Sequence, residues 1–388
     1  VNLDYVTFNE PSMTNGREGT LMATSSAETR FRITATLTCV LAATLTLGAC
    51  SAQTPGGDSA PTSATDTDAC KRNQDAGTIT YISGYGYSAS AGQLDVFLAE
   101  ELGYFDDLCL DVEINASGAN GQQLVASGQA QFTALGSASD VMLAAANSKN
   151  LTAVATYGTT PPFSIFGNEK LESLKDLEGG SLGYFINLTP IASAMLDEAG
   201  VDVSKVEMVK MTNYDPTVVV REQVDAIVGY ASNQPQSLKA QDLPFSEFLP
   251  SDLGVEGTYN VMEVNSRFLD EHREVAADFM RASLKALQYC LDESDACIDK
   301  LAKLAEDNDQ GAAFPRDQLA RTWEVESAWV RESAGGNPGV QTEAMWEPEY
   351  ALVKKYGDVK ELPAIADMMD ADLVADLYDG DTLIWQAE

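Results

Sequence analysis

Small polar loops that carry tyrosine follow most of the apolar segments of this 388-residue chain. Tyrosine rings offer flat faces on which another ring can stack, at about 0.5–1.5 kcal/mol beyond the area that they bury. Serine, threonine and asparagine side chains add groups that both donate and accept hydrogen bonds. This chemistry favours the recognition of a small organic solute over bond cleavage. The candidate contact residues are Tyr85, Tyr87, Ser117, Ser137, Tyr157, Tyr184, Asn187, Thr189, Tyr230 and Asn233.

Helix capping is the alternative explanation for any one of the hydroxyl residues. Ser137 and Thr189 each precede a helical pattern, where a side-chain oxygen can accept a bond from a free backbone N–H group. Five such loops converging on one sheet edge are more specific than any single residue. Ligands of open α/β sheets bind beyond the carboxyl ends of the strands, which is where these loops would lie.

Residues for catalysis and metal binding are sparse. His272 is the only histidine, which excludes a zinc site built on histidines. It is far in sequence from the tyrosine-bearing loops, so no Ser/His/Asp or Cys/His set can be assembled. Carboxylates are abundant, but none falls in a catalytic motif. We therefore expect no enzyme activity, no bound metal and no cofactor.

Charge narrows the class of solute. No lysine, arginine or histidine lies between Arg72 and Lys149, so an anionic solute would depend on helix N-termini or on later cations. Those cations are Lys170, Lys210, Arg221 and Lys239. A neutral or weakly basic ring-bearing solute is therefore favoured. The formal net charge of −35 argues against binding to nucleic acid or to an anionic membrane surface.

Alternating strand and helix patterns must position these loops. A second unit of the same kind begins near Pro162, and residues 257–265 are typical of a strand that returns to the first unit. Such alternation predicts mostly parallel sheets flanked by helices. After Arg267 the patterns are nearly all helical. The strands expected in the first unit are residues 78–83, 110–115, 129–136 and 151–158, and an amphipathic helix that ends at Gly103 is expected in residues 91–105.

We expect an α/β fold in the form of a two-lobed clamshell. Residues 71–160 and 259–388 would form lobe 1, and residues 161–258 would form lobe 2. Two crossings would join the lobes, with the ligand in the gap between them.

The N-terminal segment has the pattern of an export signal. Arg30 and Arg32 precede an apolar run that is shorter than the roughly 20 residues a membrane span needs. The run ends in Leu47-Gly48-Ala49-Cys50, which resembles a bacterial lipobox and implies a lipid on Cys50. We expect residues 1–49 to be a signal peptide, with Met22 as an alternative start, and residues 50–70 to be the lipidated cysteine and a flexible tether.

Four cysteines lie beyond the lipobox, and an even number in an exported chain predicts disulfides. Three pairings are possible. We favour Cys70 with Cys109 and Cys290 with Cys297, because the second pair would close the short helical segment YCLDESDAC.

Several motifs together resemble one family of binding proteins. AEELGYFDDLCLDVEINASGANGQQLVASGQAQF combines a helix ending in GYF, a strand, a glycine turn and a second helix. LESLKDLEGGSLGYF, VDAIVGYASNQPQSL and DLGVEGTYNVMEVNSRFLDEH continue the match to about Leu291. These segments resemble the type 2 periplasmic binding proteins for nitrate, taurine, sulfonates and thiamine-pyrimidine precursors. Gln234 departs from the pyrimidine-precursor branch, which has a glutamate at this position before the proline.

The resemblance implies a substrate-binding lipoprotein of an ABC transporter. A monomer on the outer face of the cytoplasmic membrane would deliver a small solute, such as a thiamine-precursor-like heterocycle, to permease subunits. An alkanesulfonate, taurine or nitrate is the alternative ligand. A pyrimidine-synthase-like enzyme, which would consume its own histidine, and a lipoprotein that only scaffolds or senses are the alternatives from other classes.

Overall fold

The computed structural model describes residues 67–116, 120–148, 150–185, 187–333 and 337–385. Within this part of the chain the first five-stranded sheet has the order β2-β1-β3-β10-β4. Strands β1, β2, β3 and β4 run in one direction, and β10 lies antiparallel between β3 and β4. The bounds of these strands are β1 (Thr78–Ile82), β2 (Asp111–Asn115), β3 (Phe132–Leu135), β4 (Leu151–Gly158) and β10 (Tyr259–Asn265).

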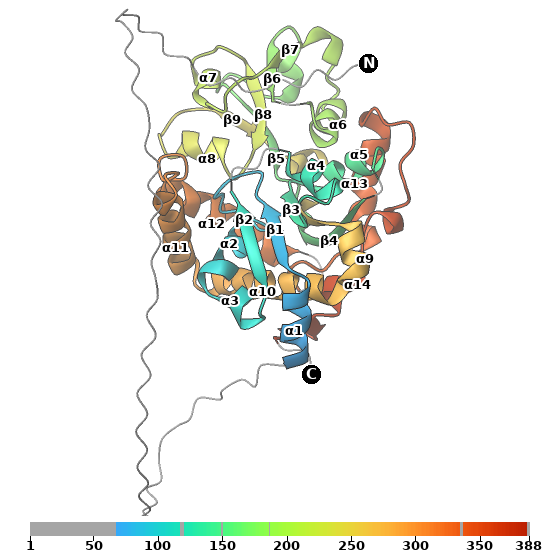
Figure 1. The fold of residues 1–388 in the computed structure, drawn as a ribbon. Coiled ribbons are helices and arrows are strands. Elements are labelled where there is room, and N and C mark those ends of the chain that lie inside the picture. Colours follow the sequence, from blue (N-terminus) through green and yellow to red (C-terminus); the bar gives the residue numbers. More distant parts are fainter. Residues whose placement is uncertain (1–66, 117–119, 149, 186, 334–336, 386–388) are drawn as a thin grey trace, which may run out of the picture. The chain divides into compact units, whose positions relative to one another are not determined.

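The second sheet repeats this topology with the order β7-β6-β8-β5-β9. Again one strand, β5, is antiparallel to its two neighbours, and the others run the same way. The predicted α/β class with two mostly parallel sheets is therefore confirmed (Figure 1). The bounds of these strands are β5 (Phe163–Gly167), β6 (Ser181–Tyr184), β7 (Glu207–Lys210), β8 (Ala226–Tyr230) and β9 (Ser246–Phe248).

Helices flank both sheets, and their ends follow from local sequence. The expected end of the first helix at Gly103 agrees with the structure: α2 ends at Glu101, and Gly103, with a φ of 74°, separates it from the short helix α3. Thr189 caps α6 and is followed by Pro190, which suits the first helical position. The helices are α1 (Thr67–Asp75), α2 (Leu94–Glu101), α3 (Tyr104–Asp107), α4 (Gly121–Ala126), α5 (Ala138–Ala145), α6 (Pro190–Glu198), α7 (Thr217–Val220) and α8 (Gln234–Lys239).

The C-terminal third is mostly helical, as expected, but it also holds the hairpin of β11 (Tyr378–Asp379) and β12 (Thr382–Leu383). α10 packs against α2 and α3 of the first-sheet half, and α13 contacts both α5 and α6. No described helix is both long and apolar enough to cross a membrane. These helices are α9 (Ser266–Glu271), α10 (Arg273–Asp292), α11 (Ser294–Asp307), α12 (Arg316–Glu332), α13 (Glu343–Tyr356) and α14 (Asp372–Ala375).

Aromatic rings fill the core beneath the first sheet. Phe279 of α10 stacks on Phe132 of β3 at 4.1 Å between ring centroids and on Phe105 at 5.2 Å. The second sheet has a smaller aliphatic core that includes Ile165 and Leu182. Each sheet thus has its own buried core, and the rigid α10 side of the first sheet supports the loops beyond its strand ends.

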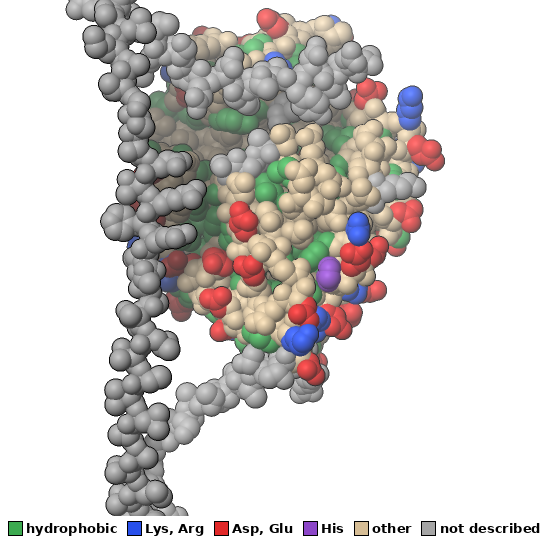
Figure 2. All heavy atoms as spheres, viewed as in Figure 1, with side chains coloured by type: hydrophobic (Ala, Val, Ile, Leu, Met, Phe, Trp, Pro, Cys, Tyr) green, Lys and Arg blue, Asp and Glu red, His purple; other side chains and the backbone are tan. Residues whose placement is uncertain are grey.

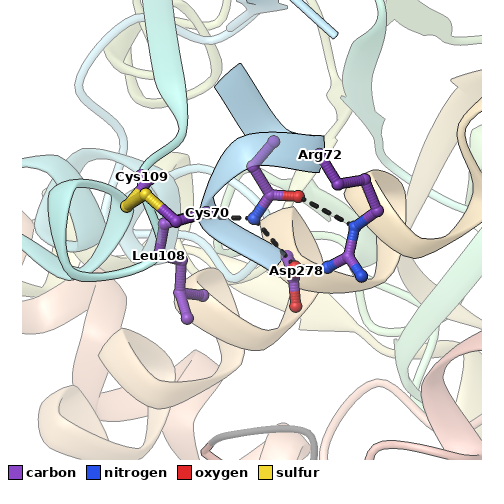
Figure 3. The surroundings of a disulfide bond; sticks show 6 residues. Cys70, Arg72, Leu108, Cys109 and Asp278 are labelled. Carbon is purple, nitrogen blue, oxygen red and sulfur yellow. Dashed lines mark hydrogen bonds and ion pairs between the residues drawn. A yellow bond between two sulfur atoms is a disulfide. The ribbon is translucent and has the colours of Figure 1, made fainter. Parts of the chain in front are cut away.

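Both predicted disulfides are confirmed. Cys70 of α1 bonds to Cys109, which precedes β2, and Cys290 bonds to Cys297 across the break between α10 and α11. Figure 3 shows the first bond with Leu108 and Asp278 nearby. The Asn73 amide donates to the Leu108 carbonyl and to Asp278. α1 is thereby fixed to the first-sheet half. The predicted signal peptide, Cys50 and nearly all of the tether lie outside the described residues.

Candidate ligand site at the junction of the two sheets

The two sheets meet at the ends where their parallel strands finish. β4 ends at Gly158 and β5 begins at Phe163, and residues 159–162 between them span at most about 14 Å. Phe163 pairs in register with Tyr230, the last residue of β8. The loop after β1 therefore lies close to the loop after β8. In Figure 2 hydrophobic side chains gather in a recess on the left, between the second-sheet part at the top and the first-sheet part below.

Tyr85 and Tyr230 contact each other across this junction. The Tyr230 hydroxyl donates to the Tyr85 hydroxyl at 3.4 Å, and the two ring centroids are 6.0 Å apart. Tyr85 is 45% exposed, so part of its surface is open to a ligand. Two of the predicted contact residues, one from each sheet, are thus brought together.

Three further aromatic residues extend this surface on the second-sheet side. Phe163 lies 5.1 Å from the Tyr230 ring, and Phe185 stacks on Tyr214 at 4.1 Å. Tyr214 is 63% exposed and close enough to Tyr85 to interact with it electrostatically. We call Tyr85, Phe163, Phe185, Tyr214 and Tyr230 the aromatic junction. Tyr214, which follows the edge strand β7, was not among the residues predicted from the sequence.

Gly136 is the residue that lets Tyr230 reach the first sheet. A Cβ atom on Gly136 would lie 2.1 Å from the Tyr230 hydroxyl oxygen. The residue therefore has to be glycine for the two halves to approach this closely.

Replacing Gly136 by alanine is expected to lower the free energy of unfolding by about 1–3 kcal/mol, the usual cost of overpacking. Gly84→Ala is the matched control, because it lies in the neighbouring loop and its Cβ would meet nothing within 4 Å. Urea unfolding of both variants measures the difference. Equal stabilities of the two variants would contradict the close approach of Tyr230.

A carboxyl group gives the junction its charge. Oδ2 of Asp140, in the first turn of α5, accepts a bond from the Gly136 N–H at 3.2 Å. Burial raises the pKa of Asp140 to about 6, and the charge of Glu349 adds to the rise. Asp140 interacts electrostatically with both Tyr85 and Tyr230. A hydrogen-bond donor or a cation on a ligand would find its partner here.

The cations of the second-sheet half differ in how free they are to bind an anion near Asp140. Lys170, Arg221 and Lys239 each form an ion pair with a carboxylate of the same half. Lys210 is exposed at the end of β7, in register with Tyr184, and forms no ion pair within the described residues. Lys210 is therefore the cation with most freedom to meet an anion near the ends of the second-sheet strands.

Two of the predicted tyrosines lie in the core instead of at the junction. Tyr157 is fully buried, and its hydroxyl donates to Asp95 at 3.2 Å. Tyr87 is 6% exposed and stacks on Phe97 at 4.6 Å. Both rings fill space under the first-sheet loops, so the prediction that they contact a solute disagrees with where the structure places them.

The predicted hydroxyl residues cap helices, as the alternative explanation holds. Ser137 accepts from the Ser139 N–H and donates to Glu349 at 2.6 Å, and it is buried. Thr189 accepts from the Ala192 N–H at 3.1 Å.

The remaining predicted residues stay candidates for solute contact. Asn187 is exposed, Tyr184 is half-buried, and Asn233 accepts a bond from Gln318 at 3.0 Å. Gln234, the departure noted above, accepts from the Tyr230 N–H at 2.8 Å and so supports the loop. Ser117 lies outside the described residues.

Within the described residues the junction holds no histidine and no free cysteine. His272 follows α9, beyond the end of the antiparallel strand β10, which puts it at the opposite edge of the first sheet. It lines a shallow groove with Arg72 and Asp75 of α1. All four cysteines in the described residues are in disulfides, and these residues hold no cluster suited to a metal ion.

Residues 92–296, more than half of the chain, match the family described as NMT1/THI5 like. The chain belongs to the NMT1/THI5-like family. The match includes Asp140, Phe163, Phe185, Tyr214 and Tyr230, whereas Tyr85 lies before its first residue. It confirms the resemblance drawn from the sequence motifs.

Two curated relatives are binding proteins. The formylaminopyrimidine-binding protein of Halalkalibacterium halodurans is 29% identical over 285 residues, which cover 70% of this chain and 83% of the relative. The riboflavin-binding protein RibY of Chloroflexus aurantiacus is 25% identical over 173 residues, covering 42% of this chain and 48% of the relative. The chain thus spans most of the first protein and about half of the second.

Solved structures share the fold at lower identity. The periplasmic aliphatic sulphonate binding protein SsuA of Escherichia coli has a TM-score of 0.53 and 13% identity, with 75% of this chain and 91% of SsuA covered. The desulfurization enzyme DSZB has the same TM-score and identity, with 77% and 98% covered. At such identities the likeness shows the fold alone.

Proposed function

We propose that this chain is the solute-binding component of an ABC importer and that it holds a ring-bearing organic solute at the aromatic junction. The observation that carries the proposal is the contact of Tyr85, from the first-sheet half, with Tyr230 of the second sheet, with Tyr214 close enough to interact electrostatically with Tyr85. Tyr85 and Tyr214 are also the only aromatic residues among the large hydrophobic side chains that are exposed in the described part of the chain. A planar solute between them would cover both ring faces at once.

The chemical class that fits best is an aminopyrimidine-like or other heterocycle with hydrogen-bond donors. Such a solute would stack on the tyrosine rings and donate to the Asp140 carboxyl. An alkanesulfonate, taurine or nitrate would have to approach the same carboxyl and would depend on Lys210 or on backbone N–H groups. The formylaminopyrimidine-binding relative supports a heterocycle. A sulfonate remains the alternative because the chain shares its fold with SsuA.

Transport would follow from closure of the two lobes, which we place at residues 71–160 with 259–388 and at residues 161–258. A solute that contacts both lobes binds the closed form more tightly than the open form, and the equilibrium shifts by that difference in affinity. The closed monomer would dock on permease subunits. A lipid on Cys50 would hold it at the outer face of the cytoplasmic membrane.

A thermal-shift screen tests the proposal with five compounds: a formylaminopyrimidine, riboflavin, taurine, methanesulfonate and nitrate. Binding at 100 times Kd adds about 2.7 kcal/mol to the free energy of unfolding, which raises Tm by several degrees in a domain of this size. We expect a shift with one of the two heterocycles. No shift from any of the five compounds would count against a solute-binding function.

Two single substitutions separate the two solute classes. Asp140→Asn is expected to weaken binding of the heterocycle about tenfold and to leave anions unaffected, because it removes the charged acceptor. Lys210→Ala is expected to have the opposite selectivity. If taurine or methanesulfonate raises Tm in the wild type but not in Lys210→Ala, the solute is a sulfonate and not a heterocycle.

A further inference from the structure

Glu326 of α12 is a buried carboxyl group directly behind the aromatic junction. The side chain is 1% exposed, and its two oxygens accept from different parts of the molecule. Oε1 accepts from the Ser232 hydroxyl at 2.5 Å, and Oε2 accepts from the Tyr259 hydroxyl. A buried carboxylate is costly unless hydrogen bonds satisfy both of its oxygens, and here both have partners.

The first of these bonds fixes the loop that carries Tyr230. Ser232 is two residues beyond Tyr230, in the turn before α8. The Thr322 hydroxyl, one helical turn before Glu326, donates to the Ser232 carbonyl at 3.2 Å. Gln318, one turn earlier again, donates to Asn233 at 3.0 Å. One face of α12 therefore holds three successive polar groups against the Tyr230 loop.

The second bond leads to the loop that carries Tyr85. The Tyr259 hydroxyl, besides donating to Glu326, accepts from the Ala91 N–H at 3.1 Å. Asn260, the next residue of β10, donates to the Ala91 carbonyl at 2.7 Å. Ser90 also reaches the Glu326 carboxyl with its side chain. Ala91 and Ser90 belong to the same loop as Tyr85, between β1 and α2.

We propose that Glu326 is a positioning residue that fixes the position of the Tyr85 loop relative to the Tyr230 loop. It contacts no solute itself and acts through the two tyrosines. Its effect on affinity rests on the proposed function. The relative position of the two loops, in contrast, is a property of the free protein. A carboxyl suits this role because its two acceptor oxygens diverge, one toward each loop.

The test places ¹⁹F labels on the tyrosines and reads their NMR signals in the free protein. Protein made with 3-fluorotyrosine gives separate signals, which Tyr85→Phe and Tyr230→Phe assign. Glu326→Ala is expected to shift and broaden both signals, because each loop loses its bond to α12. Unchanged signals of Tyr85 and Tyr230 would overturn the proposal.

Asp278→Asn is the matched control for the loss of a buried carboxyl. Asp278 is 4% exposed on α10 and is bonded to Arg72 and Asn73, away from the junction. It is expected to lower Tm but to leave both ¹⁹F signals in place. If the control moves them as much as Glu326→Ala does, the effect is general destabilisation and the proposal is wrong.

Glu326→Gln covers the case in which the alanine variant does not fold. Glutamine keeps the volume and one acceptor oxygen, so one loop stays held and one tyrosine signal should move less than the other. Signals of both tyrosines identical to those of the wild type in Glu326→Gln would also overturn the proposal.

Affinity for a formylaminopyrimidine gives the functional readout. We expect Kd to rise about tenfold in Glu326→Ala and less than twofold in Asp278→Asn. A wild-type protein that binds none of the five screened compounds would count against the proposed function, whereas the ¹⁹F signals of the free protein would still decide the role of Glu326. An unchanged Kd in Glu326→Ala, with binding intact in the wild type, would overturn the positioning role.

Discussion

Replacing Tyr85 and Tyr214 together by alanine is expected to weaken solute binding by about two orders of magnitude. Each exposed ring offers one face to the solute, and loss of an aromatic contact at the centre of a binding site costs about 1–2 kcal/mol or more. Two such losses weaken binding by about 2–3 kcal/mol. Because every 1.4 kcal/mol changes Kd tenfold, Kd is expected to rise about 100-fold. Isothermal titration with a formylaminopyrimidine or riboflavin measures the change.

Two controls separate stacking from other effects. Tyr85→Phe with Tyr214→Phe keeps both rings and should keep most of the affinity. Val203→Ala shortens a side chain of a residue that is 40% exposed. Val203 precedes β7 and therefore lies at the other end of this strand from Tyr214. If the double alanine variant binds as tightly as Val203→Ala, the solute does not lie between these two tyrosines.

Stability is expected to fall by several kcal/mol as the pH rises from 5 to 9. Burial raises the pKa of Glu263 in β10 to about 8 and that of Asp95 to about 7. Between its unfolded and folded pKa values, such an acid keeps its proton in the native state and loses it in the unfolded state. The native state then binds more protons, so the free energy of unfolding decreases as the pH increases.

Acids with lowered pKa values do not reverse this slope. Lysine contacts hold the pKa of Glu178 and Asp197 below the usual range, so their contribution is complete by about pH 5 and is lost only in acid. The window from pH 5 to pH 9 therefore reports on the buried acids.

Glu263→Gln isolates the largest of these contributions. Glu263 is fully buried, contacts only the Gln122 amide through its carboxyl in the described residues, and faces the charge of Asp140. Glutamine removes the ionisation and keeps the shape, so the loss of stability between pH 6 and pH 9 should shrink by on the order of 2–4 kcal/mol. Glu113→Gln, on the exposed side of β2, is the control. Parallel pH profiles of the two variants in urea unfolding would contradict burial of Glu263 as an acid.

Strands and the Cys290–Cys297 disulfide could be predicted from the sequence because their signals are local. Residues 151–158 and 163–167 are apolar runs between turn residues, and β4 and β5 have those bounds. The spacing of Cys290 and Cys297 limits what each can reach. The expected helix end at Gly103 was also a local signal, and α2 ends at Glu101, just before this glycine.

The candidate site could be predicted only in part, because burial depends on tertiary packing. Tyr85 and Tyr87 stand in the small polar loop after β1, and Tyr157 is near the end of β4, yet only Tyr85 is exposed. The other two rings pack against α2, where Tyr87 stacks on Phe97 and Tyr157 donates to Asp95. Tyr214 and Asp140 were missed because neither lies near Tyr85 in the sequence. The fold brings them to Tyr85.

The most direct test is a crystal structure of the protein with the screened solute that gives the largest rise in Tm. We predict that the ring of the solute lies against Tyr85 and Tyr214, within contact of Tyr230, with a donor group on the Asp140 carboxyl. A solute bound elsewhere, with these tyrosines in contact only with each other, would contradict the proposed site.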